Sequence, residues 1–194
     1  IPKYLKEQGY YTFSMHGNLA SMWNRNKAHP SLGYDGMYFR DSFTYSNEDV
    51  INLGINDHMF FAQGVPILEN IEKTYGNYMG IVITLSNHSP FKLASLHSEL
   101  DLTSHYTSTN EITKETTEIS KDYLSGTAIG EYIKSANYAD GALGDFLNYI
   151  KNSSEFDNTV FVFYGDHDAK LSRNEINYLY NLNPATGEVY TEND

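Results

Sequence analysis

The segment that most constrains the fold is Thr159–His167, an apolar run that ends abruptly in Gly-Asp-His. The run from Val160 to Phe163 shows no polar alternation, which is typical of a strand buried on both faces of a sheet. Such strands occur in α/β proteins, which bind ligands at the carboxyl ends of their strands. A carboxylate and an imidazole, here Asp166 and His167, suit a divalent metal ion at that edge. The alternative is that Asp166 caps a turn and that His167 is incidental.

The rest of the chain alternates strands and helices. Residues 10–15 and 78–85 are expected to be strands, and the second to be buried. Helical spacing of apolar residues predicts helices over 57–75 and 129–150, and residues 3–8 resemble the end of another helix. Because helices that connect strands produce right-handed crossovers, the expected fold is α/β, with a mostly parallel central sheet flanked by helices.

Residues 1–194 are expected to form one partial domain. Residues 19–47 are expected to be irregular, with a short helix near 20–26. The Ser/Thr-rich segment 96–120 has little periodicity and is expected to be a surface excursion or lid. The chain begins at Ile1 without Met and ends in a polar run, so it is expected to be truncated at both ends.

Composition excludes several classes of function. The chain carries 25 acidic and 13 basic residues, a net charge of −12, so no nucleic-acid partner is expected. It contains no cysteine, which excludes disulfides and thiolate chemistry in this segment. No stretch of about 18 apolar residues is present, so any membrane attachment is expected only through segments outside this chain.

Histidines follow each of the three expected strands. His16 ends the first strand, His88 follows the second, and Asp166 and His167 follow the third. Since parallel strands bring their carboxyl ends to one edge, we expect these residues to form a shared polar site. However, two protein ligands do not hold a metal firmly, because a usable site needs about three or four.

An aromatic residue and a cation lie close to the first histidine, as Trp23 and Arg25. The arginine fork matches phosphate or carboxylate, and the indole can cover the apolar part of a small ligand. The alternative is an arginine stacked on a surface tryptophan. No glycine-rich phosphate loop, nucleophile elbow or H-E-x-x-H motif is present.

The remaining polar residues are expected to be structural. Asp57, beside His58 at a helix start, is expected to be a capping residue. Asp168 could itself be a ligand, but it is expected rather to support a neighbouring ligand or to form a turn. Three histidines are expected to be exposed in loop-like sequence: His29, His97 and His105.

Seven motifs in one order carry a family resemblance. They are Ser14–Asn18, Trp23–Arg25, Leu32–Gly36, Gly54–Phe61, Ile83–Phe91, Tyr132–Tyr138 and Tyr164–His167, of which N-H-x-P-F and Y-G-D-H are the most diagnostic. With these motifs the chain resembles the extracellular catalytic domain of lipoteichoic acid synthases and related phosphoglycerol transferases. These enzymes belong to the sulfatase and alkaline phosphatase superfamily.

The resemblance implies roles for individual residues. Asp166 and His167 would be ligands of one divalent ion, typically manganese, with magnesium or zinc as alternatives. Four residues would line the pocket for a glycerol phosphate headgroup: His16, Trp23, Arg25 and His88. Apart from the resemblance, His88 is expected to be catalytic and to protonate the leaving alkoxide, because histidine is a common general acid. The family's nucleophile is a threonine and its remaining metal ligand a glutamate, both of which are expected to precede Ile1.

The function implied is metal-dependent transfer of a phosphoglycerol-type headgroup from a membrane lipid to a glycolipid or polyol-phosphate acceptor. The parent protein is expected at the extracellular face of a bacterial cell membrane. Without the nucleophile, the segment is expected to be inactive alone, and to self-associate through unpaired strand edges. The alternatives are a sulfatase or phosphodiesterase of the same superfamily and a non-catalytic relative that binds wall polymer.

Overall fold

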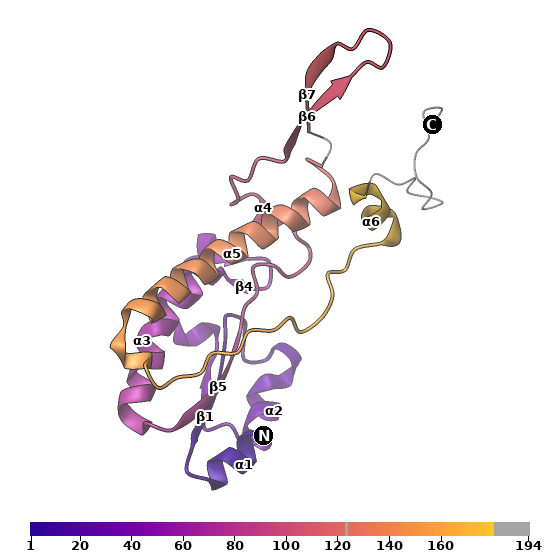
Figure 1. Cartoon of the computed structure of the whole chain (residues 1–194). Coiled ribbons are helices and arrows are strands. Elements are labelled where there is room, and N and C mark those ends of the chain that lie inside the picture. Colours follow the sequence, from indigo (N-terminus) through magenta and orange to yellow (C-terminus); the bar gives the residue numbers. More distant parts are fainter. Residues whose placement is uncertain (123, 181–194) are drawn as a thin grey trace. The chain divides into compact units, whose positions relative to one another are not determined.

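The computed structural model describes residues 1–122 and 124–180 and contains two compact units (Figure 1). The first unit comprises Ile1–His88 and Tyr138–His167. Among the described residues, the second comprises those of Ser89–Asn137 and those from Asp168 to Tyr180. The long helix α5 (Ala128–Asn152) contributes residues to both.

The sheet of the first unit is parallel. In the described residues it has the order β2-β1-β5, with β1 (Tyr11–His16) in the centre between β2 (Gly36–Tyr38) and β5 (Tyr78–Ile83). Met15 pairs with Tyr38 on one side, and His16 pairs with Ile83 on the other. The expected parallel α/β fold is therefore confirmed. β2 was not expected, and β5 is half-buried rather than buried.

The helices confirm the main periodic segments. The first unit contains α1 (Pro2–Glu7), α2 (Arg25–Leu32) and α3 (Asp57–Tyr75). Its short elements are η1 (Met22–Asn24), η2 (Arg40–Ser42), η3 (Asn47–Asp49), η4 (Ser154–Phe156) and the antiparallel pair β3 (Val50–Ile51) and β4 (Gly54–Ile55). α3 matches the expected bounds, and α5 extends the expected range by one residue at one end and two at the other. The helical segment expected near 20–26 is present as η1 and the start of α2, and it continues to Leu32.

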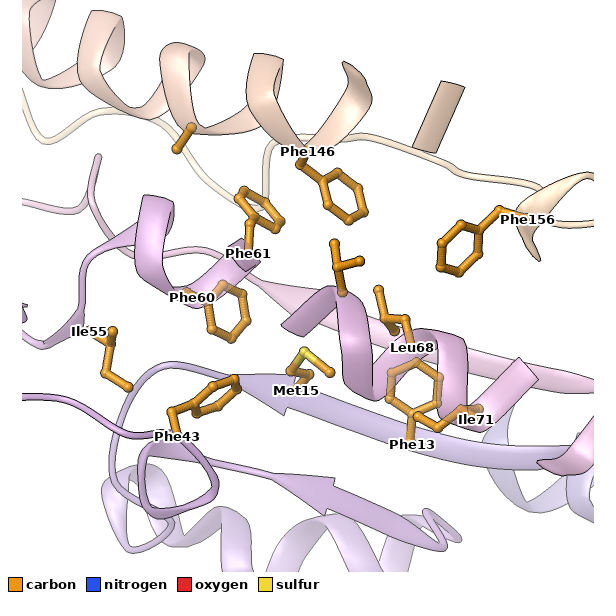
Figure 2. Close-up of a cluster of buried hydrophobic side chains, with 12 residues drawn as sticks. Phe13, Met15, Phe43, Ile55, Phe60, Phe61, Leu68, Ile71, Phe146 and Phe156 are labelled. Carbon is orange, nitrogen blue, oxygen red and sulfur yellow. The ribbon is translucent and has the colours of Figure 1, made fainter. Parts of the chain in front are cut away.

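The hydrophobic core lies on one face of β1. Phe13 and Met15 point into it, and Figure 2 shows the α3 side chains Phe60 and Leu68 between β1 and Phe146 of α5. A Cβ at Gly64 of α3 would lie 3.1 Å from the Met15 sulfur, so the glycine allows the helix close to the strand. Burial of these apolar side chains stabilises the unit and fixes the end of β1.

The opposite face of β1 is polar, although it is equally buried. Successive strand residues alternate between faces, so Thr12, Ser14 and His16 share the side away from Phe13. All three are buried. The Thr12 hydroxyl donates to the Gly33 carbonyl (2.8 Å), and the Ser14 hydroxyl hydrogen-bonds to His29 Nδ1 (2.7 Å). This polar face therefore holds α2 through Ser14 and the segment after α2 through Thr12.

The expectation of a buried strand over 160–163 is wrong. Val160 is 86 % exposed and Val162 is 75 % exposed, and no ladder within the described residues includes them. Only Phe161 packs inward, with its ring 5.8 Å from that of Phe146. A strand is buried on both faces only when strands flank it and layers cover it. An apolar run does not reveal whether those neighbours are present.

The second unit contains a β-hairpin and two short helices besides the start of α5. These are α4 (Lys92–Ser95), β6 (Thr103–Thr109), β7 (Thr116–Asp122) and α6 (Arg173–Leu179). β6 and β7 pair in antiparallel register, and most of their side chains are exposed. The Ser98 hydroxyl donates to Asn137 Oδ1 on α5 (2.7 Å). Much of the segment 96–120 is thus hairpin.

Across the described part of the chain, no helix combines the length and hydropathy needed to cross a membrane.

Candidate functional site

His16 and the end of β5 define the carboxyl edge of the sheet. The His16 ring is 1 % exposed, and its Nδ1–H donates to the Ile83 carbonyl (3.0 Å). Burial lowers the pKa of His16 to about 4, and Arg25, His29 and His88 act in the same direction, whereas the bond to Ile83 opposes the change. At neutral pH the ring is therefore uncharged, and its Nε2 is an acceptor rather than a proton donor.

Arg25 is a buried cation without a carboxylate partner in the described residues. It is 9 % exposed, and its Nη1 is buried with no hydrogen-bond partner there. Its guanidinium carbon lies 5.1 Å from the ring centroid of Trp23, which is exposed. The stacking that sequence reasoning offered as an alternative is thus present, but the arginine is not a surface residue. Burial lowers the pKa of Arg25 and makes an anionic ligand favourable here.

The backbone before Arg25 adopts an unusual conformation. Trp23 and Asn24 have φ of 51° and 56°, in the left-handed region that non-glycine residues seldom adopt. Two such residues in succession turn the chain from η1 into α2 and place Arg25 at the first position of the helix. This local conformation, together with the polar face of β1, sets where the guanidinium lies.

The other expected site residues lie together in the first unit. The rings of His88 and His167 are 5.8 Å apart, edge to face. His167 Nε2 lies 3.7 Å from Asp166 Oδ1. The electrostatic effect of His88 on His16 links this group to the buried histidine. The structure therefore brings His88 close to both groups, although residues 160–163 form no strand.

A buried carboxylate holds the loop that carries His88. The Asp57 carboxylate accepts hydrogen bonds from the amides of Leu85 (2.9 Å) and Ser86 (3.0 Å). Asn56, rather than Asp57, caps α3 by accepting from the Met59 amide. The capping role expected of Asp57 is wrong, because its side chain points to the end of β5 instead. Burial raises the pKa of Asp57, and these hydrogen bonds oppose the rise.

The expectation that His29 is exposed in a loop is wrong. This residue lies in α2, half-buried and hydrogen-bonded to Ser14, whereas His97 and His105 are exposed as expected. Burial lowers the pKa of His29, and the charge of Arg25 adds to this. The spacing of four residues between Arg25 and His29 is the sequence signal that places both on one side of a helix.

The donor atoms of Asp166 and His167 suit a divalent ion, but these two residues alone do not complete a metal site. A carboxylate oxygen and an imidazole nitrogen are donors that manganese, magnesium and zinc accept to different degrees. In the part of the chain that the structure describes, no group of three or more His, Cys, Asp or Glu is placed to hold a metal. The pair supplies two donors, whereas about three or four are required.

Comparisons with known proteins assign the sequence to one family. The family model described as Sulfatase matches residues 1–188. Lipoteichoic acid synthase 1 of Bacillus subtilis (strain 168) is 31 % identical over 163 residues, which are 84 % of this chain and 22 % of that protein. Lipoteichoic acid synthase of Staphylococcus aureus (strain USA300) is 30 % identical over 177 residues, which are 91 % of this chain and 24 % of that protein. The chain thus spans about a quarter of the length of these relatives.

Solved structures share the fold. The crystal structure of the lipoteichoic acid synthase LtaP from Listeria monocytogenes matches with a TM-score of 0.72 and 31 % identity, covering 95 % of this chain and 41 % of that one. A protein in the alkaline phosphatase superfamily from Vibrio parahaemolyticus matches with a TM-score of 0.56 and 25 % identity, covering 80 % and 32 %. The chain has the alkaline phosphatase superfamily fold, is similar to lipoteichoic acid synthases, and belongs to the sulfatase family.

Proposed function

We propose that the protein transfers a phosphoglycerol-type headgroup from a membrane lipid to a glycolipid or polyol-phosphate acceptor, with a divalent metal ion. The observation that carries the proposal is Arg25, a buried guanidinium without an acidic partner in the described residues, close to an uncharged His16. The similarity to proteins named lipoteichoic acid synthases supports the same reaction class. The place of action we propose is the extracellular face of a bacterial cell membrane.

The anionic group of the substrate would bind to Arg25. Phosphoryl transfer depends mainly on positioning and on neutralising charge on the phosphate oxygens, and a guanidinium fork provides both. Trp23, which already stacks on Arg25, would cover the glycerol carbons. His16 would line the headgroup pocket in its neutral form, since its Nδ1–H is committed to the Ile83 carbonyl.

His88 would donate the proton that the leaving alkoxide takes. It lies on the loop after β5, and its carbonyl accepts a hydrogen bond from Asn52 Nδ2 (3.2 Å), which helps to hold the loop. Imidazole is the usual side chain for this role, and a positioned general acid accelerates such a step by about 10² to 10⁴. His88 and His16 thus have different tasks, because His16 is buried in its neutral form.

Asp166 and His167 would hold the metal ion, for which we propose manganese. A bound divalent ion would neutralise charge on a phosphate oxygen and favour the ionised form of the attacking hydroxyl. By the resemblance, that hydroxyl belongs to a threonine, and a glutamate completes the ligand set. The proposal assigns neither to a residue of this sequence.

The test is a transfer assay on the complete protein, with a lipid whose glycerol phosphate headgroup is labelled and a glycolipid acceptor. We expect label in the acceptor only when a divalent ion is present, and an Arg25→Ala variant that transfers at least about tenfold more slowly. Arg173→Ala is the matched control, because it removes an exposed arginine of α6 that is far from Arg25 in sequence.

Other outcomes select the alternatives. Release of labelled headgroup into water without transfer would indicate a phosphodiesterase, and cleavage of sulfate esters would indicate a sulfatase. Binding of wall polymer without turnover, independent of a divalent ion, would indicate a non-catalytic relative. Any of these results would contradict the transferase proposal.

A further inference from the structure

The start of α2 has no side-chain cap. The N-cap residue Asn24 has left-handed backbone angles, and its side chain makes no capping hydrogen bond. Side-chain caps typically stabilise a helix start by about 1 kcal/mol. The amides of Arg25 and Asn26 donate to the carbonyls of Met22 and Ala20, but these backbone bonds do not hold the Arg25 side chain.

A side-chain contact that ties α2 to the sheet lies one turn along the helix. His29 follows Arg25 by four residues, so the two side chains lie on the same side of α2. Arg25 is buried and His29 is half-buried, whereas Asn26 and Lys27 between them are exposed. The His29 ring packs near Tyr34 (5.2 Å) and Phe39 (5.8 Å), and its Nδ1 hydrogen-bonds to the Ser14 hydroxyl.

Ser14 is a rigid partner for this contact. It lies in the middle of β1, is fully buried, and pairs with Met37 of β2 and Ile81 of β5. His16 lies two residues further along the strand, on the same face, and both Arg25 and His29 lower its pKa. The hydrogen bond of 2.7 Å thus connects the helix that carries Arg25 to the strand that carries His16.

We propose that His29 is a positioning residue for Arg25, acting through its hydrogen bond to Ser14. The inference rests on the proposed function, because that function gives Arg25 an anionic ligand. The Ser14–His29 bond fixes α2 against β1, so that the guanidinium is held near His16 before a phosphate binds. A site organised in advance loses less conformational entropy on binding, and its affinity is correspondingly higher.

An uncharged His29 suits this role. Burial and the charge of Arg25 both lower its pKa and so favour its neutral form. A neutral ring provides the hydrogen bond without placing a second positive charge beside Arg25 and competing for the same anion. A lysine or arginine at this position would place a second permanent positive charge beside Arg25.

The test measures binding of glycerol phosphate to the complete metal-loaded protein by calorimetry, together with KM and kcat for transfer. Ser14→Ala and His29→Ala should each weaken binding about fivefold, the effect of one hydrogen bond, and should raise KM more than they lower kcat. The double variant should be no weaker than either single one. His29→Asn, whose amide lies where Nδ1 lies, should recover most of the affinity.

Two controls separate positioning from general damage. Thr12→Val removes hydrogen bonds to Gly33 and Asp35 on the same face of β1, but these lie beyond the end of α2. It should lower the melting temperature and leave glycerol phosphate affinity unchanged. In an Arg25→Ala background, Ser14→Ala should have no further effect on affinity, because the group that it positions is gone.

Equal losses of affinity in Thr12→Val and Ser14→Ala would overturn the proposal, as would a full effect of Ser14→Ala in the Arg25→Ala background. If Arg25→Ala weakens binding but the Ser14 and His29 variants do not, only the positioning role fails. If Arg25→Ala itself leaves glycerol phosphate binding unchanged, the anion site of the proposed function fails, and this inference fails with it.

Discussion

Asp57 and Ser86 are hydrogen-bonded to each other in both directions. The Asp57 amide donates to the Ser86 hydroxyl (2.9 Å), and the Ser86 amide donates to the Asp57 carboxylate (3.0 Å). Both residues are buried. One belongs to the first turn of α3 and the other to the loop after β5, so the pair ties a core helix to the segment that carries His88.

Replacing Asp57 should therefore destabilise the protein. Asp57→Asn turns one acceptor oxygen into an N–H group that faces a backbone amide, which leaves a buried donor unpaired. We expect the free energy of unfolding to fall by about 1 to 3 kcal/mol, measured with denaturant. Asp145→Asn is the matched control, because that carboxylate is exposed and should change stability by less than about 0.5 kcal/mol. A loss of stability in Asp57→Asn as small as that in Asp145→Asn would show that the Asp57 hydrogen bonds do not stabilise the protein.

His16 predicts a loss of stability in mild acid. Its pKa in the folded protein, about 4, is below the ordinary histidine value of 6.5, so the unfolded chain takes up a proton more readily. The contribution of His16 is fully present above pH 6.5 and is lost as the pH falls toward 4. At about 1.4 kcal/mol per pH unit, the loss reaches at most about 3.5 kcal/mol.

The matched variant for this effect is His16→Asn. It keeps a side-chain N–H that can donate to the Ile83 carbonyl, but it does not titrate. Unfolding free energies measured from about pH 7.5 to about pH 4 should fall less steeply for the variant than for the native protein. Parallel curves for the two proteins would contradict the assignment of a buried, neutral His16.

His88 is predicted to act in catalysis rather than in metal binding. In the complete protein, His88→Ala should lower kcat by about 10² or more while the bound metal, measured by elemental analysis, stays unchanged. His97→Ala, at an exposed histidine of the same chain, should change neither. An equal loss of metal and activity in His88→Ala would make His88 a ligand or a structural residue.

Asp166 is predicted to act through the metal. Asp166→Ala should abolish both metal binding and metal-dependent transfer, because a carboxylate oxygen is removed from a small ligand set. Asp157→Ala removes an exposed carboxylate nearby in sequence and should have no such effect. Full activity of Asp166→Ala would remove the metal assignment.

Periodic segments were predicted well, and contacts that depend on neighbouring strands were not. α3 and α5 follow from the spacing of their apolar residues, and β1 follows from its composition. The run 160–163 has the composition of a buried strand, but burial requires partners that composition does not specify. β2 has only three residues, too few to give a periodic signal.

The site residues, too, were predictable where a general rule applies and unpredictable where a contact comes from another element. The convergence of His16, His88 and His167 was expected from a rule about parallel strands, and the rings of His88 and His167 lie together even though residues 160–163 form no strand. His29 was misplaced because α2 is polar and contains Pro30, so its sequence resembles a loop. Its role depends on Ser14, which lies in another element and which no local pattern connects to it.

The exposed apolar residues of 160–163 predict self-association of the 194-residue chain. Phe161 faces the core, whereas Val160 and Val162 point away from it and lie on a segment with no strand partner in the described residues. An extended segment of this kind pairs readily with another chain. Val162→Lys should therefore lower the apparent mass in light scattering, because a charge opposes edge pairing. Ile112→Lys is the control, since Ile112 is 91 % exposed but lies in the loop between β6 and β7. If both substitutions reduce association equally, general surface hydrophobicity rather than the 160–163 edge drives it.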